Sequence, residues 1–220
     1  MFVGHYAAAF ALKAKEKNAS LGMLFIAVQF VDILFFPFVV IGVERLKFVP
    51  SFTEVNNFNL EYYPFTHGLL GSLFWATLFY VVYRFVVVRK HPTRNKISWI
   101  MALGVLSHWF ADLIVHTPDL PLVSGTPKFG FGLWKSKVLT FAVEAFLLGL
   151  SAFYYLWHTQ AKSAFGKYPV MIFTGFLLLI NYLNMFVLLA NEDINALTIS
   201  ALFFYFLFAL IAYFVEKSRF

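Results

Sequence analysis

Six apolar stretches of about twenty residues follow one another along the chain, and they constrain the fold more than any other feature. A helix rises 1.5 Å per residue, so about 20 residues cross a hydrocarbon core roughly 30 Å thick. The composition agrees, because 61% of the 220 residues are hydrophobic and only 13% are charged, too few to cover a soluble globule. The sequence therefore predicts an all-α, polytopic transmembrane helix bundle in a single domain over 1–220. The six predicted spans are 20–43, 67–88, 98–117, 137–157, 169–190 and 196–215.

The segment before the first span, 2–12, is helix-prone but too short to cross a membrane. We expect it to form a half-helix, either buried in the bundle or lying at the interface. Its lysines, Lys13, Lys15 and Lys17, follow the apolar part, whereas in a signal peptide they precede it. We therefore expect no cleavage.

The basic residues determine the expected topology. Most of the 17 Lys and Arg fall in the segments on the same side as residues 13–17, including the turn 89–96. Because cytoplasmic loops carry the excess of positive charge, we expect both termini in the cytoplasm of a cell (inner) membrane protein. The net charge of +6 then reflects topology, and no nucleic-acid partner is expected.

One apolar span carries a polar stripe. His108, Asp112 and His116 are four residues apart, so in a helix they share one face. Ionisable groups inside a membrane are costly and persist mostly when they are paired, bound to metal or functional. Asp119 follows just after Pro118, which ends the predicted helix.

Helix rise places other polar groups at matching depths. We expect a cup that opens away from the cytoplasm, with four groups at its base and three nearer its mouth. The base consists of His5, Asp32, His108 and Asp112, and the mouth of His67, His116 and Glu144.

Imidazole and carboxylate groups without any cysteine suit a divalent metal, with zinc first and manganese or iron as alternatives. Such an ion lowers the pKa of bound water and polarises a phosphoryl or carbonyl oxygen, which is hydrolase chemistry. We assign Glu144 and His116 to the catalytic step; for Glu144 the roles of base, partner of a metal ligand and proton relay all stay open.

Several motifs within 4–146 resemble the YdjM-like membrane-bound metal-dependent hydrolases, small bacterial multi-pass proteins. They are Gly4-His5-Tyr6, Gln29-Phe30-Val31-Asp32, Tyr63-Pro64-Phe65-Thr66-His67-Gly68, Ser107-His108-Trp109 with Asp112 and His116, and Gly130-Phe131-Gly132-Leu133-Trp134 with Glu144. The resemblance implies metal ligation by His5, Asp32, His67, His108 and Asp112, with His116 as a further candidate. Gly68 and Lys135 depart from the family's usual serine and asparagine.

Other classes of function stay open. A transporter or permease would use the same buried groups as a proton or cation path, with broken helices or inverted repeats, and the sequence shows no clear repeat. A non-catalytic assembly subunit would use them to hold spans together. The expected partners are the lipid bilayer and a lipid or phosphoester substrate, and the oligomeric state is left open.

Overall fold

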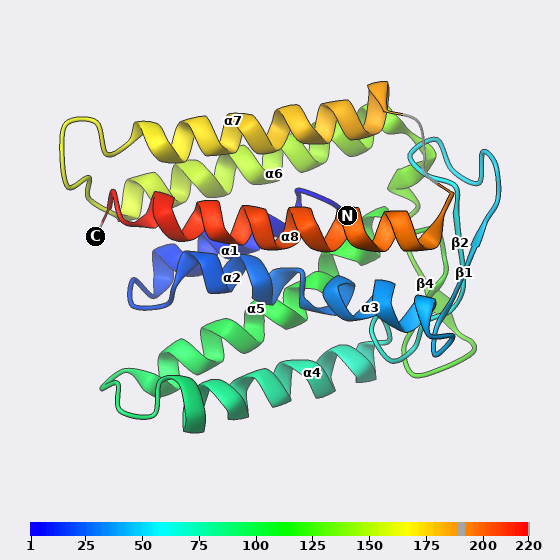
Figure 1. The fold of residues 1–220 in the computed structure, drawn as a ribbon, viewed down its shortest axis with the longest axis horizontal. Helices are drawn as coiled ribbons and strands as arrows, with labels where there is room; N and C mark the ends of the chain where they lie inside the picture. The colour runs from blue at the N-terminus through cyan, green and yellow to red at the C-terminus, as the bar shows by residue number, and fades with distance from the viewer. Residues whose placement is uncertain (189–191, 220) are drawn as a thin grey trace.

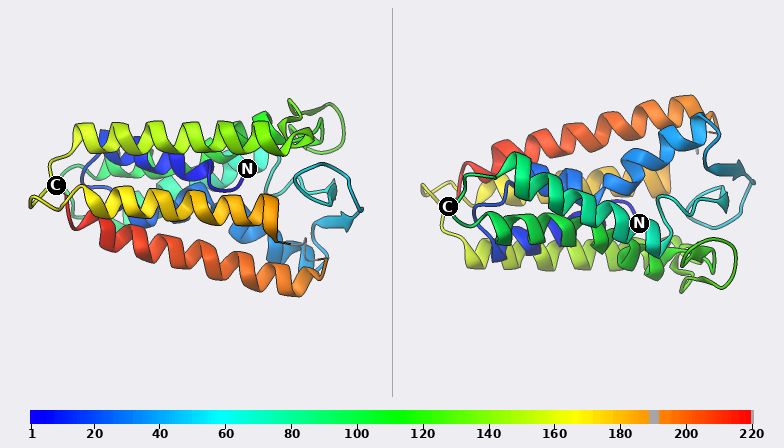
Figure 2. Two further views of the ribbon diagram at one scale, coloured as in Figure 1. Left: turned by 90° about the horizontal axis from the view of Figure 1, so that it is seen from above. Right: turned by 90° about the horizontal axis from the view of Figure 1, so that it is seen from below.

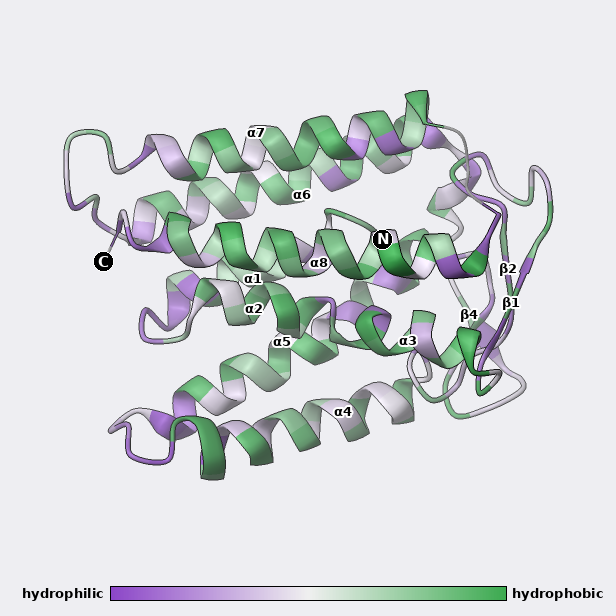
Figure 3. Ribbon diagram, in the orientation of Figure 1, coloured by the Kyte–Doolittle hydropathy of each residue, from purple (hydrophilic) through white to green (hydrophobic). Residues whose placement is uncertain are grey.

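The computed structural model describes residues 1–188 and 192–219 and shows a bundle of long, nearly parallel helices (Figure 1). We call the end that carries the strands β1 and β2 the hairpin end, and the opposite end, near the C-terminus, the basic end. Figure 3 shows apolar residues along the helices and polar residues gathered in the loops at both ends. The distribution is that of a multi-pass membrane protein.

Five helical segments are long and apolar enough to cross a membrane, and a sixth span is made of two short helices in series. The long ones are α4 (Leu69–Val82) continued by the π-helical turn η1 (Tyr83–Val87), α5 (Arg94–Val115), α6 (Lys137–His158), α7 (Tyr168–Tyr182) continued by the π-helical turn η3 (Leu183–Val187), and α8 (Ile194–Glu216). The sixth combines α2 (Leu21–Val28) and α3 (Phe30–Val40). The predicted all-α bundle of six spans is confirmed, and residues 189–190 of the fifth predicted span lie outside the described residues.

The half-helix α1 (His5–Lys15) lies inside the bundle. Tyr6 and Phe10 are fully buried, and the Tyr6 ring stacks on Phe25 of α2 at 4.3 Å between centroids. The chain starts in the interior and reaches the basic end at Lys13, whose ammonium contacts Glu216 of α8 at 2.6 Å. Of the two predicted placements for this segment, the structure shows the buried one.

The span made of α2 and α3 bends by 46° at Gln29. Proline is a common cause of helix kinks, but the proline of this span, Pro37, lies within the continuous helix α3. At the bend, the carbonyl oxygen of Val28 bonds the His108 ring at 2.7 Å. In a regular helix this oxygen would accept the backbone N–H of the residue four positions later. A side chain from α5 therefore enters the helical hydrogen-bond ladder of this span.

The segment between the first two predicted spans, 44–65, contains an antiparallel hairpin of β1 (Arg45–Phe48) and β2 (Phe58–Tyr62). Their register pairs Phe48 with Phe58, whose rings lie 5.8 Å apart. The segment after α5 carries a second small pairing, β3 (Leu120–Pro121) with β4 (Lys128–Phe129), followed by the 3-10 turn η2 (Leu133–Lys135). Both sheets lie at the hairpin end (Figure 2).

Gly22 marks the closest approach of α2 to α8. A Cβ at Gly22 would lie 2.7 Å from the Ala209 carbonyl oxygen and 2.8 Å from Tyr213 Cβ, whereas one at Gly149 of α6 would meet nothing within 4 Å. We expect Gly22→Ala to lower the free energy of unfolding by about 1–3 kcal/mol, because overpacking forces the helices apart. Thermal unfolding in detergent measures this, with Gly149→Ala as the matched control. Equal stability of the two variants would contradict the close packing of α2 on α8.

Candidate metal centre

Four segments of the chain bring their ionisable side chains to one buried place near the hairpin end, which we call the His/Asp centre. It consists of His5 on α1, Asp32 on α3, His67 just before α4, and His108 and Asp112 on α5, with His116 at the end of α5. The four histidines and Asp112 are buried, and the side chain of Asp32 is 14% exposed. All five predicted metal ligands therefore come together.

The tautomer of His108 follows from its hydrogen bond. Its Nδ1 lies 2.7 Å from the carbonyl oxygen of Val28. A carbonyl oxygen only accepts, so Nδ1 carries the proton and donates it. In the neutral ring Nε2 is then left with a lone pair, and it lies 3.0 Å from Asp112 Oδ2 without forming a hydrogen bond.

His67 is also held through its Nδ1, by a hydrogen-bond chain that runs through Thr66 to Glu44. Thr66 Oγ1 donates its only proton to Glu44 Oε2 at 2.7 Å, so its 2.8 Å contact with His67 Nδ1 requires that the ring nitrogen donate. Glu44 also accepts the backbone N–H groups of Phe65 and Thr66 through Oε1 at 2.9 Å. A buried carboxylate thus fixes both the loop and the ring.

His116 donates from Nδ1 to Asp119 Oδ1 at 2.9 Å. The same carboxylate accepts the Tyr63 hydroxyl and, on its other oxygen, the Thr117 hydroxyl, both at 2.8 Å. Burial favours the neutral acid, but these three hydrogen bonds hold the pKa of Asp119 below its usual value. Asp119 is therefore a charged acceptor that orients His116.

With three Nδ1 atoms engaged, three Nε2 atoms point toward two carboxylates. His67 Nε2 lies 3.1 Å from Asp32 Oδ1, and the Nε2 atoms of His108 and His116 lie 3.0 and 3.5 Å from Asp112 Oδ2. A carboxylate oxygen only accepts, so each of these contacts needs positive charge between nitrogen and oxygen, carried either by a proton on Nε2 or by a bound cation. The contact between His67 Nε2 and Asp32 Oδ1 has the geometry of a hydrogen bond.

The spacing of these atoms fits a shared ion. Ligands at 2.0–2.1 Å from a tetrahedral metal lie about 3.3 Å from one another. Two overlapping groups place their candidate ligand atoms within 4.8 Å of one another, one made of His67, His108 and Asp112 and the other of His5, Asp32 and His108. Because His108 belongs to both, the donor set suits one ion or two adjacent ions.

His5 and Met1, at the buried start of the chain, both contact Asp112 of the centre. The His5 ring stacks on His108 at 3.7 Å between centroids, and its Nε2 lies 3.2 Å from Asp112 Oδ1. Neither ring nitrogen of His5 has a hydrogen-bond partner. The Met1 α-amino group lies 2.5 Å from Asp112 Oδ1, so that this oxygen faces both groups.

Glu144 is fully buried and holds the start of the chain. Its two carboxylate oxygens accept the N–H groups of Phe2 and Gly4 at 3.2 and 3.0 Å, and Asn181 of α7 donates to it at 3.4 Å. A Cβ at Gly4 would lie 3.1 Å from Glu144 Cγ, so a glycine allows this close approach. The catalytic role assigned to Glu144 stays a prediction.

Sequence reasoning missed four residues that orient the centre. Glu44 and Tyr63 lie outside the spans, Thr66 precedes the N-cap of α4, which is Gly68, and Tyr205 on α8 donates to Asp32 Oδ2 at 3.2 Å. His67, expected nearer the mouth, contacts Asp32 of the expected base at 3.1 Å. A carboxylate at the end of an apolar span was the one signal that pointed to Glu44.

A cavity of about 860 Å³ opens onto the centre. Its polar floor includes Asp32, His67, Asp112, His116 and Glu144. Both residues assigned to catalysis therefore line the space in which a substrate would meet the proposed metal ligands.

No protein-family profile, no curated protein and no solved structure matches the chain. The resemblance to the YdjM-like hydrolases therefore stays a prediction. The chemical interpretation rests on the geometry of the centre.

Glu44→Gln tests the hydrogen-bond chain to His67. The amide removes the charged acceptor and offers N–H donors to Thr66, so we expect zinc affinity to fall about 10–100-fold. Isothermal titration of the detergent-solubilised protein measures this, with Glu61→Gln on the exposed face of β2 as the control. Unchanged affinity in Glu44→Gln would show that the chain from Glu44 does not orient a metal ligand.

Proposed function

We propose that the protein is a membrane-embedded, metal-dependent hydrolase that acts on a phosphoester or other lipid-borne ester. One observation carries the proposal: three buried imidazoles, each committed at Nδ1 to its own acceptor, direct Nε2 toward two buried carboxylates. This is the pattern by which proteins orient histidine ligands of a metal.

His67, His108, Asp32 and Asp112 would hold the ion, with His5 as a further ligand. Nitrogen and carboxylate donors without thiolate favour zinc first, with manganese or iron as alternatives. When bound, such an ion supplies Lewis acidity and a water of lowered pKa. Two carboxylates also balance a divalent cation in an apolar surround.

The remaining polar groups of the cavity floor suit proton transfer. His116 is oriented by Asp119, and its Nε2 faces the centre, 3.5 Å from Asp112 Oδ2. Glu144 lines the same cavity, and its carboxylate holds the start of the chain by accepting the backbone N–H of Gly4. We assign His116 and Glu144 to delivering and accepting protons at the scissile ester.

The charge distribution sets the proposed orientation. Lys13, Lys15, Lys17 and the turn 89–96 lie at the basic end, so this end would face the cytoplasm of a cell membrane. The cavity at the hairpin end would then open outward, away from the cytoplasm.

One observation favours a second candidate, a transporter or permease. The span made of α2 and α3 breaks at Gln29, three residues before the buried Asp32, and broken spans beside ionisable groups form ion paths in transporters. Uptake of protons or substrate into proteoliposomes without turnover would identify this candidate.

Metal content tests the proposal. We expect the detergent-purified wild type to carry near-stoichiometric zinc by elemental analysis, and His108→Ala and Asp112→Ala to lose most of it, because each removes a donor from the centre. His158→Ala, at an exposed position, is the control. A wild type that binds no metal under any loading condition would overturn the proposal.

Hydrolysis of a phospholipid or a lipid ester in mixed micelles should depend on the same residues and stop on chelation. Activity that survives in His108→Ala would show that the metal is structural and not catalytic. Readdition of zinc should restore the wild type after chelation, which separates metal loss from unfolding.

A further inference from the structure

The cavity extends beyond the His/Asp centre into the space between α7 and α8. Its wall there is built from the hairpin-end parts of both helices, Asn184, Met185 and Leu188 on one side and Leu197, Ser200, Ala201 and Phe204 on the other. Apart from Asn184 and Ser200, all these side chains are apolar. None of them belongs to the motifs in 4–146.

The two helices separate toward the hairpin end. In the basic half, Phe173 and Leu177 of α7 share a core cluster with Phe208 of α8. In the other half, Leu197 and Ala201 of α8 pack on a different cluster, around Phe35 of α3. Figures 1 and 2 both show the ribbons of α7 and α8 diverging in this direction. The cavity fills the resulting opening.

The apolar wall leads directly to the centre. From Leu197 to Tyr205 the helix α8 advances about 12 Å, and the Tyr205 hydroxyl at the end of this stretch donates to Asp32. An occupant along this wall would therefore place one end against the proposed metal ligands. A small water-soluble ester would leave this apolar wall exposed to water, whereas a hydrocarbon chain would cover it.

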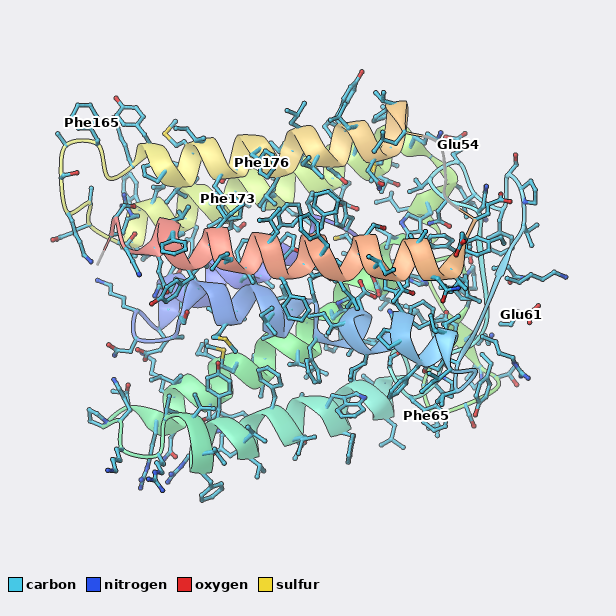
Figure 4. The ribbon with its side chains drawn as sticks, viewed as in Figure 1. Glu54, Glu61, Phe65, Phe165, Phe173 and Phe176 are labelled. Atoms are coloured by element: carbon cyan, nitrogen blue, oxygen red, sulfur yellow. The ribbon has the colours of Figure 1, made fainter. Side chains whose placement is uncertain are left out.

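The mouth of the cavity is polar. Lys137 is the one Lys or Arg among the described residues that line it, and it stands with Asn56, Asn57 and Glu54 at the hairpin end. Figure 4 shows Glu54 beside this end of the bundle, where its carboxylate accepts the backbone N–H of Lys137 at 3.0 Å. The cavity thus combines an apolar wall, an ionisable floor and a polar mouth with one ammonium.

We propose that this space is a lipid-binding chamber: a membrane lipid places a hydrocarbon chain between the hairpin-end halves of α7 and α8, its ester at the His/Asp centre and its polar end toward Lys137. The proposal rests on the proposed hydrolase function and names its substrate class as a lipid with a long chain. It also gives the two C-terminal spans a role, because they form the wall that selects the chain.

Ala201→Trp tests the chamber by filling the wall, and Ile199→Trp, on the exposed face of the same helix, is the matched control. We expect the ratio of turnover of a long-chain ester to that of a soluble short-chain ester to fall at least tenfold in Ala201→Trp only. Zinc content should be the same in both variants. An unchanged ratio in Ala201→Trp would overturn the chamber, and so would a wild type that turns over only the soluble ester.

A binding measurement separates failure of the chamber from failure of the hydrolase. Mass spectrometry of lipid retained by the washed protein, and titration with a fluorescent long-chain phospholipid, both read occupancy without turnover. We expect Ala201→Trp to retain less lipid than Ile199→Trp even when zinc has been removed. Retention that is equal in the two variants would overturn the chamber, whereas lower retention in a protein without hydrolytic activity would refute only the hydrolase.

Discussion

Two carboxylates inside an apolar bundle, the buried Asp112 and the largely covered Asp32, are the constraint on which the rest of the structure depends. An uncompensated charge at such a position costs several kcal/mol, so every segment that reaches the centre brings a compensating group. Asp32 meets His67 and the Tyr205 hydroxyl, and Asp112 meets His108 and the Met1 α-amino group. The start of the chain, three spans (the one made of α2 and α3, α5, and α8) and the loop before α4 are thereby tied to one place.

The same constraint shapes the backbone. The bend at Gln29 frees the Val28 carbonyl for His108, and a straight helix would have used that carbonyl for its own ladder. Gln29 also bonds across to the Phe2 carbonyl, which fixes the buried start of the chain beside the bend. The irregular span therefore provides hydrogen-bond acceptors that a regular one does not have.

The sequence predicted the parts of this arrangement that depend on period and length. Apolar runs of twenty residues determined the spans, and the four-residue spacing of His108 and Asp112 determined their common face. The residues that orient the histidines were not predictable, because Glu44 and Tyr63 reach them through tertiary folding of loops without a recognisable period. The bend was not predictable from local sequence either, because it lies away from Pro37, where the carbonyl of Val28 bonds a side chain from another helix.

How the imidazoles are held bears on the choice between a hydrolase and an ion path. A proton relay needs rings that exchange protons between their two nitrogens, but His67, His108 and His116 each have Nδ1 engaged with an acceptor, and two of those acceptors lead to the carboxylates Glu44 and Asp119. Such rings are fixed in orientation and tautomer, which suits ligands that must present one lone pair each. Among the described residues, His5 is the one ring of the four without a hydrogen bond at either nitrogen, and its Nε2 lies 3.2 Å from Asp112 Oδ1. The arrangement of the other three therefore favours holding an ion in place over passing a charge along.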